Sequence, residues 1–154
     1  MRSNKKHTLP IIIILFGMLF SIISLPNHYY FRTAALDIGA YTNALYDYIH
    51  FQWNDSTVIL PEAQNLLADH FDVYLIIFAP LSLLFKTYTL LVVQIAALLF
   101  GGFGIYTYFN SSNTLSKYKL HGTVYFFLFF GVYSALSFDY HSNVIAACLV
   151  PWFF

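Results

Sequence analysis

Acidic and imidazole side chains occur in three short groups in this chain, and each group stands beside an apolar segment. Asp37 follows the first apolar run, Asp69-His70-Phe71-Asp72 precedes the second, and Phe138-Asp139-Tyr140-His141 follows a later one. A carboxylate close to an imidazole can fix the histidine tautomer, hold an anion when the ring is charged, or contribute to a metal site. Ionisable groups gathered at the edge of an apolar bundle are candidates for a functional site.

Each group also has an ordinary structural explanation. Asp37 begins a helical pattern and could accept the free amides of the first turn as an N-cap. Asp72 could cap the short helix that follows it, and Ser142 could cap the last apolar segment. His141 could simply face lipid headgroups, as aromatic residues at a membrane interface do. The occurrence of three such groups at separate helix ends favours a shared site over three unrelated caps.

Neighbouring residues indicate what such a site could bind. Tyr29-Tyr30-Phe31-Arg32 could stack on a sugar and pair with a phosphate, although anchoring at the membrane interface is the more ordinary role. Two or three acid and imidazole groups are too few to identify a metal. A divalent metal is therefore possible, with Asp139 and His141 as candidate ligands, and the cofactor is otherwise left open. Cys148 is the single cysteine, and no Cys/His spacing resembles a structural zinc site.

The composition of the whole chain is that of a membrane protein. Of its 154 residues, 59% are hydrophobic, 21% are aromatic and only 9% are charged. The formal net charge is zero, so no basic surface for nucleic acid is expected. We expect a polytopic, all-α bundle in the lipid bilayer, with spans at about residues 9–25, 88–109 and 123–137. The apolar segment 143–154 resembles an unfinished fourth span, so residues 1–154 are expected to be one transmembrane domain fragment.

The first apolar run could instead be a cleaved signal peptide. Its length, roughly 17 residues, is at the short limit for a spanning helix but exceeds a typical signal-peptide core. The small pair Ala34-Ala35 comes late and follows a bulky segment that makes a poor cleavage site. A retained anchor is therefore favoured, with the basic N-terminus in the cytoplasm.

Residues 26–72 form the only long polar stretch, and we expect them to be external. Within this stretch, apolar residues at helical spacing, Tyr41 among them, predict an amphipathic helix of roughly four turns that lies at the interface. Segment 73–85 carries Pro80 and has only about 13 residues, which is short for a crossing. It is expected to form a short re-entrant or interfacial helix.

Whether segment 73–85 crosses decides which polar groups share a compartment. If it does not cross, all three groups are external: Asp37, Asp69, His70, Asp72, Asp139 and His141. Lys117 and Lys119 then lie in the cytoplasm, which agrees with the excess of basic residues on cytoplasmic loops. If the segment does cross, Asp139 moves to the cytoplasmic side and no common site can form. The charge distribution favours the first topology.

Three segments resemble the N-terminal part of a prokaryotic family of predicted membrane proteins that carry a domain of unknown function. They are Asp37-Ile38-Gly39-Ala40-Tyr41-Thr42-Asn43-Ala44-Leu45-Tyr46, Leu67-Ala68-Asp69-His70-Phe71 and Phe138-Asp139-Tyr140-His141, together with Ala79-Pro80-Leu81 and Gln94. The resemblance covers roughly residues 36–154. The departures are Asn43 where Gln is usual, Tyr46 where Trp is usual and Ser142 where Pro is usual. None of these departures removes an acid or an imidazole.

That family looks like a relative of the GT-C glycosyltransferases, multi-pass enzymes that use polyprenyl-phosphate-linked sugars. The resemblance implies an inverting transferase at the external face, and it implies that Asp37 is the catalytic base because GT-C enzymes carry an essential Asp just after the first span. Arg32, Asp69, His70 and His141 would then bind substrate or the leaving phosphate.

Two other classes of function remain open. A transporter or flippase component would place ionisable groups near the bilayer centre, and no such group is evident inside the expected spans. A non-enzymatic membrane protein would use its acids only as helix caps. Gln94 and the Gly101–Gly104 cluster are expected to serve helix packing, and Asp47 is expected to be solvated.

Overall fold

The computed structural model describes all residues except 1–6, 34, 58–61, 63 and 70, and the described chain is almost entirely helical. The longer helices are α1 (Thr8–Tyr29), α2 (Ala35–Ile49), α6 (Thr89–Ser111), α7 (Lys119–Phe127), α8 (Phe130–Phe138) and α9 (Ser142–Leu149). The shorter ones are α3 (Leu66–Asp69), α4 (Leu75–Phe78), η1 (Ala79–Leu81), α5 (Ser82–Phe85), η2 (Lys86–Tyr88), η3 (Ser116–Tyr118) and η4 (Val150–Trp152). The strands β1 (Asp55–Ser56) and β2 (Gln64–Asn65) form an antiparallel pair.

Three helical stretches of the described chain are long and apolar enough to cross a membrane: Thr8–Tyr29, Leu75–Ser111 and Ser116–Phe138. A shorter apolar stretch covers Ser142–Trp152. Many large apolar side chains of α1, such as Ile14, Met18 and Ile22, are exposed, as expected of a helix whose surroundings are lipid. The prediction of an all-α, multi-pass membrane bundle is therefore confirmed.

Two helix boundaries differ from those expected. The first helix continues beyond residue 25, through Pro26, and ends at Tyr29, whose successor Tyr30 donates its amide to the Pro26 carbonyl. The stretch around residues 123–137 consists of two helices, because Phe129 adopts an extended conformation between α7 and α8. Neither feature changes which ends of the helices lie together.

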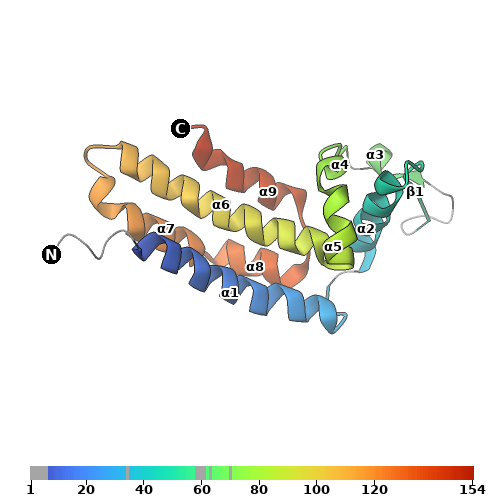
Figure 1. Ribbon diagram of the computed structural model, residues 1–154, viewed down its shortest axis with the longest axis horizontal. Coiled ribbons are helices and arrows are strands. Elements are labelled where there is room, and N and C mark those ends of the chain that lie inside the picture. The colour runs from blue at the N-terminus through green and yellow to red at the C-terminus, as the bar shows by residue number, and fades with distance from the viewer. Residues whose placement is uncertain (1–6, 34, 58–61, 63, 70) are drawn as a thin grey trace.

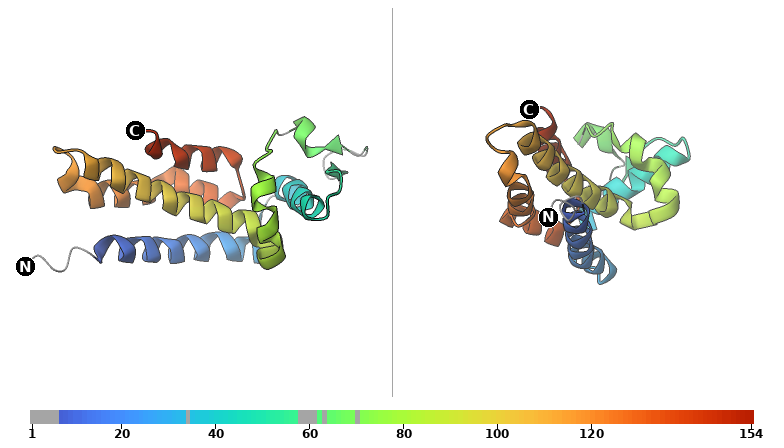
Figure 2. Two further views of the ribbon diagram at one scale, coloured as in Figure 1. Left: turned by 45° about the horizontal axis from the view of Figure 1, so that its top comes forward. Right: turned by 60° about the vertical axis from the view of Figure 1, so that its left-hand side comes forward.

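The spanning helices lie side by side along the long axis of the molecule, and the remaining elements gather at one end of it (Figure 1). α1, α6, the α7–α8 pair and α9 make the bundle, while α2, α3 and β1 lie beyond its end (Figure 1). The α4–α5 segment runs across the bundle axis in both figures, so only α6 of the stretch Leu75–Ser111 follows the bundle (Figure 2). That the crosswise segment enters the bilayer and returns stays a prediction.

Direct contacts show that the chain leaves the bundle and returns to it at the same end. His28, in the last turn of α1, lies 3.1 Å from the Thr87 hydroxyl through Nε2, and its ring packs edge-on against Tyr88 at 4.7 Å. The side-chain amide of Asn27 donates through Nδ2 to the Ser137 carbonyl of α8 at 3.4 Å. The ends of α1 and α8 and the start of α6 therefore meet.

Small residues allow the bundle helices to pack closely. A Cβ atom added at Gly102 of α6 would lie 2.1 Å from the Phe127 ring of α7, which is fully buried. Gly101 lies against the backbone of Cys148 in α9 in the same way. Small residues at helix interfaces permit such approaches inside membranes, so α6 can hold α7 and α9 on either side. This arrangement fixes the turn between α8 and α9 over the start of α6.

Candidate functional site

Side chains from three separate segments converge at the end of the bundle where α2 lies. Tyr41 of α2 donates its hydroxyl to Asp72 Oδ2 at 2.9 Å, and its ring packs edge-on against Tyr140 at 5.3 Å. The hydroxyls of Tyr74 and Tyr140 form a short hydrogen bond. We call this group the acid–tyrosine cluster, and its members are Asp37, Tyr41, Asp72, Tyr74, Asp139, Tyr140 and His141.

Asp139 is the most deeply buried acid of the cluster. Only 1% of its surface is exposed, although it lies in the turn between α8 and α9. His141 Nδ1 lies 2.9 Å from Asp139 Oδ1 at ion-pair distance, and neither carboxylate oxygen has a well-aligned hydrogen-bond partner among the described residues. A buried carboxylate in this state favours a proton, a cation or a donor from a ligand.

Burial raises the pKa of Asp139 from 3.8 to about 6, and the negative charge of Asp37 adds to this effect. The neighbouring His141 opposes it, because an imidazolium stabilises the carboxylate. The influence of Asp37 on Asp139 means that two carboxylates and an imidazole lie within electrostatic reach of one another. Their protonation states are consequently linked.

This burial predicts how stability depends on pH. The pKa of Asp139 is higher in the folded than in the unfolded protein, so protonation of Asp139 stabilises the fold. This contribution to stability is complete below about pH 4 and is lost as pH rises through about 6. We expect the midpoint of thermal unfolding in detergent to fall over this interval, and Asp139→Asn to flatten that part of the curve. Parallel pH curves for the two proteins would show that Asp139 titrates normally.

Gln94 holds the turn that carries Asp139 and His141. Its side chain is completely buried in α6, where Nε2 donates to the Asp139 carbonyl at 2.9 Å and Oε1 accepts from the His141 amide at 2.9 Å. One side chain thus satisfies a donor and an acceptor of a backbone that has left the helix. Gln94 therefore positions the acid–imidazole pair, in addition to the role in helix packing that the sequence predicts.

Asp37 and Asp72 do not act as helix caps in the expected way. α2 begins at Ala35, so Asp37 lies in its first turn, half-buried, where a negative charge is favoured by the helix dipole. The Asp72 side chain accepts from Tyr41, while its backbone carbonyl accepts the Leu75 amide at 3.1 Å. Asp37 is therefore a first-turn acid of α2, and the Asp72 side chain bonds to Tyr41 in place of a helix amide.

Of the remaining candidate residues, Arg32 has a described side chain, and this side chain is not brought into the cluster. Arg32 is exposed, its guanidinium lies 5.6 Å from the centre of the Tyr30 ring, and its amide donates to the Asn27 carbonyl. Asp69 ends α3, but its side chain, like the whole of His70, lies outside the described residues. Asp47, expected to be solvated, is instead buried and accepts from Asn43 at 3.0 Å.

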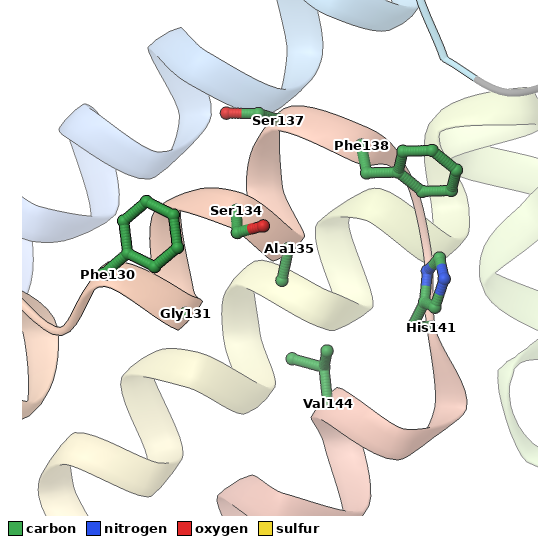
Figure 3. A pocket seen from close by; sticks show the side chains of 8 residues that line it. All are labelled: Phe130, Gly131, Ser134, Ala135, Ser137, Phe138, His141 and Val144. Atoms are coloured by element: carbon green, nitrogen blue, oxygen red, sulfur yellow. The ribbon is translucent and has the colours of Figure 1, made fainter.

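A groove of about 630 Å3 leads away from His141 along α8 and the first turn of α9 (Figure 3). His141 stands at one end of it, with 40% of its side chain exposed, and Phe138 lies beside it (Figure 3). Ser134 is the polar side chain farther along the groove, and Val144 borders it from α9. The groove is therefore lined mainly by apolar side chains, and it ends at a titratable histidine.

The described residues do not by themselves make a metal centre. Among them, no group of three or more His, Cys, Asp or Glu side chains is placed to hold a metal ion. Asp139 and His141 could supply two ligands, so a divalent metal there would need its other ligands from water or from a bound molecule.

The fold and the cluster define a multi-pass α-helical membrane protein with a polar site at one end of its bundle. The chain belongs to the family described as "Predicted membrane protein (DUF2079)", whose model matches residues 27–154. No curated protein and no solved structure matches the chain. The predicted family is confirmed, and the relation to the GT-C glycosyltransferases stays a prediction.

The tyrosines of the cluster were not foreseen as site residues. Tyr41 follows Asp37 by four residues, so the two share one face of α2, and this spacing is the signal that could have identified it. Tyr140 stands between Asp139 and His141, yet it turns to α2 and Tyr74 and is 1% exposed. The sequence offers no comparable signal for the pairing of Tyr74 with Tyr140.

Proposed function

We propose that this chain forms part of a membrane glycosyltransferase that takes its sugar from a polyprenyl-phosphate-linked donor. The observation that carries the proposal is the convergence of Asp37 with the Asp139–His141 pair at one end of the spanning bundle. A half-buried carboxylate beside a second acid and an imidazole offers both a proton acceptor and a group that can pair with phosphate.

Asp37 is the proposed general base. It takes the proton of an acceptor hydroxyl, and the acceptor oxygen forms a bond to the anomeric carbon of the sugar. The bond from that carbon to the phosphate oxygen breaks, and polyprenyl phosphate leaves with the electron pair, so the configuration inverts. A positioned base typically accelerates such a step by about 10²–10⁴.

His141 is the proposed partner of the leaving phosphate. Its partly exposed imidazole lies at the end of a groove, and Nδ1 lies 2.9 Å from Oδ1 of the Asp139 carboxylate. A cation aimed at the oxygen where charge develops stabilises the transition state. Arg32, Asp69 and His70 stay candidates for substrate binding, and Arg32 would have to turn away from Tyr30 to take part.

We place the cluster on the external face of the membrane. Lys117 lies in η3 and Lys119 begins α7, and the connection from α6 to α7 is at the end of the bundle opposite α2 (Figure 1). Basic residues in short loops favour the cytoplasmic side. Residues 26–72 would then be external, which matches a donor presented at the outer surface.

Transport is the second candidate, and the burial of Asp139 favours it. A fully buried acid whose pKa is about 6 could exchange a proton at physiological pH. Transporters place such groups near the bilayer midplane, whereas Asp139 lies in the turn between α8 and α9 at the end of the bundle. The buried amide of Gln94 beside Asp139 would suit a proton site as well.

The transferase, unlike the transporter, releases polyprenyl phosphate from the donor. The full-length protein is reconstituted in liposomes with a panel of polyprenyl-phosphate sugars labelled in the lipid, and release of polyprenyl phosphate is measured. Transferase activity predicts release that requires an acceptor. Absence of release with every donor, together with proton movement across the membrane on addition of a substrate, would establish transport instead.

A further inference from the structure

A second groove, of about 720 Å3, opens between α6, α9 and the crosswise α4–α5 segment. Its walls are apolar, with Val92 and Ala96 on α6 and Ile145 and Ala146 on α9. Both helices belong to the bundle, so the groove lies along the apolar part of the molecule (Figure 1). A hydrocarbon chain from the bilayer can enter such a groove without losing contact with apolar surroundings.

One end of this groove belongs to the acid–tyrosine cluster. Tyr74 and Ser142 are the polar side chains in its described lining. Tyr74 also bonds to Tyr140, which packs against Tyr41. The groove therefore runs from the apolar bundle to Tyr74 of the acid–tyrosine cluster, which also contains Asp37.

The charge of the two grooves differs at their polar ends. The groove in Figure 3 ends at His141, which can carry a positive charge. The groove between α6 and α9 ends at two neutral hydroxyls, and the Asp72 carboxylate lies within electrostatic reach of Tyr74. An anionic headgroup would be repelled there, whereas a hydroxyl group could donate and accept hydrogen bonds.

We propose that the groove between α6 and α9 binds one hydrocarbon chain of a neutral, hydroxyl-bearing membrane lipid. The lipid hydroxyl then lies at Tyr74 and Ser142, next to the cluster that contains Asp37. This lipid is the sugar acceptor, a statement that rests on the proposed transferase function. The acceptor is accordingly delivered from the bilayer on one side of the α8–α9 turn, and the phosphate leaves on the other.

The test uses the full-length protein in liposomes that contain a diacylglycerol with a photoreactive diazirine in one acyl chain. After irradiation, we expect labelled peptides from α6 and α9. Ala146→Phe, which fills the groove from an exposed position, is expected to lower this labelling about ten-fold. Ala147→Phe is the matched control, because Ala147 is also exposed but lies outside the groove lining.

Three results would overturn the proposal. Equal labelling of the wild-type protein and Ala146→Phe would mean that the probe reports bulk lipid. Stronger labelling by a phosphatidic acid with the same chain would exclude a neutral headgroup. A cross-link between two copies of the chain at α6 or α9, in place of the lipid, would make this face an interface.

The failure of the lipid site can be told apart from the failure of the transferase function. Specific diacylglycerol labelling without release of polyprenyl phosphate would leave the lipid site standing and remove the transferase function. Release of polyprenyl phosphate that requires a water-soluble acceptor, without specific labelling, would support the transferase and overturn the lipid acceptor.

Discussion

Asp37→Asn is expected to lower the rate of sugar transfer about 10²–10⁴-fold while the protein remains folded in the membrane. The amide keeps the size and hydrogen-bonding reach of the carboxylate, but it cannot accept the proton of the acceptor hydroxyl. Asp37 lies half-buried in the first turn of α2, so its replacement leaves no apolar cavity. The measurement is the release of polyprenyl phosphate at saturating donor, with chromatographic and thermal profiles as a check on folding.

The matched control is Asp55→Asn. Asp55 is an exposed acid in β1, at the same end of the molecule, and it belongs to no part of the proposed site (Figure 1). This variant should retain transfer, so a general loss of negative charge would not explain the result. Full activity in Asp37→Asn, with Asp55→Asn unchanged, would remove Asp37 from the role of base.

The same substitution also bears on the electrostatics of the cluster. Removal of the Asp37 charge should lower the pKa of Asp139, because Asp37 is one of the groups that raise it. The pH dependence of stability that Asp139 confers should therefore weaken in Asp37→Asn. If Asp37 did not influence Asp139, the pH dependence of stability would be the same in Asp37→Asn and the wild-type protein. A weaker dependence in the variant would therefore show that the two acids are coupled.

The apolar runs predicted the fold because a membrane leaves few choices for a backbone. Every buried amide and carbonyl of a spanning segment must be satisfied within the segment, so long apolar runs form helices. The grouping of acids beside those runs then predicted which ends could meet. The short segment with Pro80 lies across the bundle (Figure 2), and its expected re-entrant or interfacial position stays a prediction.

The break in the third span could not be predicted from composition. Residues 128–130 are as apolar as their neighbours, and nothing in their hydropathy marks the extended conformation of Phe129. The burial of Asp47 was missed for a related reason. An acid on an amphipathic helix is ordinarily solvated, and only the arrival of the loop around Asn54 and Asp55 encloses it.

The partners within the site were the least predictable feature. Tyr41 bonds to Asp72 across 31 positions of the chain, and Gln94 bonds to His141 across 47. Local periodicity carries no information about such separations, because they depend on how the helices pack. A polar residue inside a spanning run is nonetheless a signal, since its burial without a partner is costly. Gln94 could have been identified as a positioning residue on that ground.

Gln94→Leu should therefore destabilise the protein strongly. Leucine fills the volume but leaves the Asp139 carbonyl and the His141 amide without the partners that now lie at 2.9 Å. Each buried group left unsatisfied costs about 1–3 kcal/mol, so we expect the free energy of unfolding in detergent to fall by about 2–6 kcal/mol. Gln52→Leu, at an exposed position, should change it by less than about 0.5 kcal/mol.

Gln94→Glu separates the loss of a donor from the loss of the whole side chain. A glutamate can still accept from the His141 amide, but its second oxygen faces the Asp139 carbonyl and can donate only when it is protonated. Its stability should therefore be low at neutral pH and should recover in acid by more than that of Gln94→Leu, in which Asp139 titrates but residue 94 does not. Equal stability of the two variants at every pH would mean that Gln94 fills space and does not hold the turn.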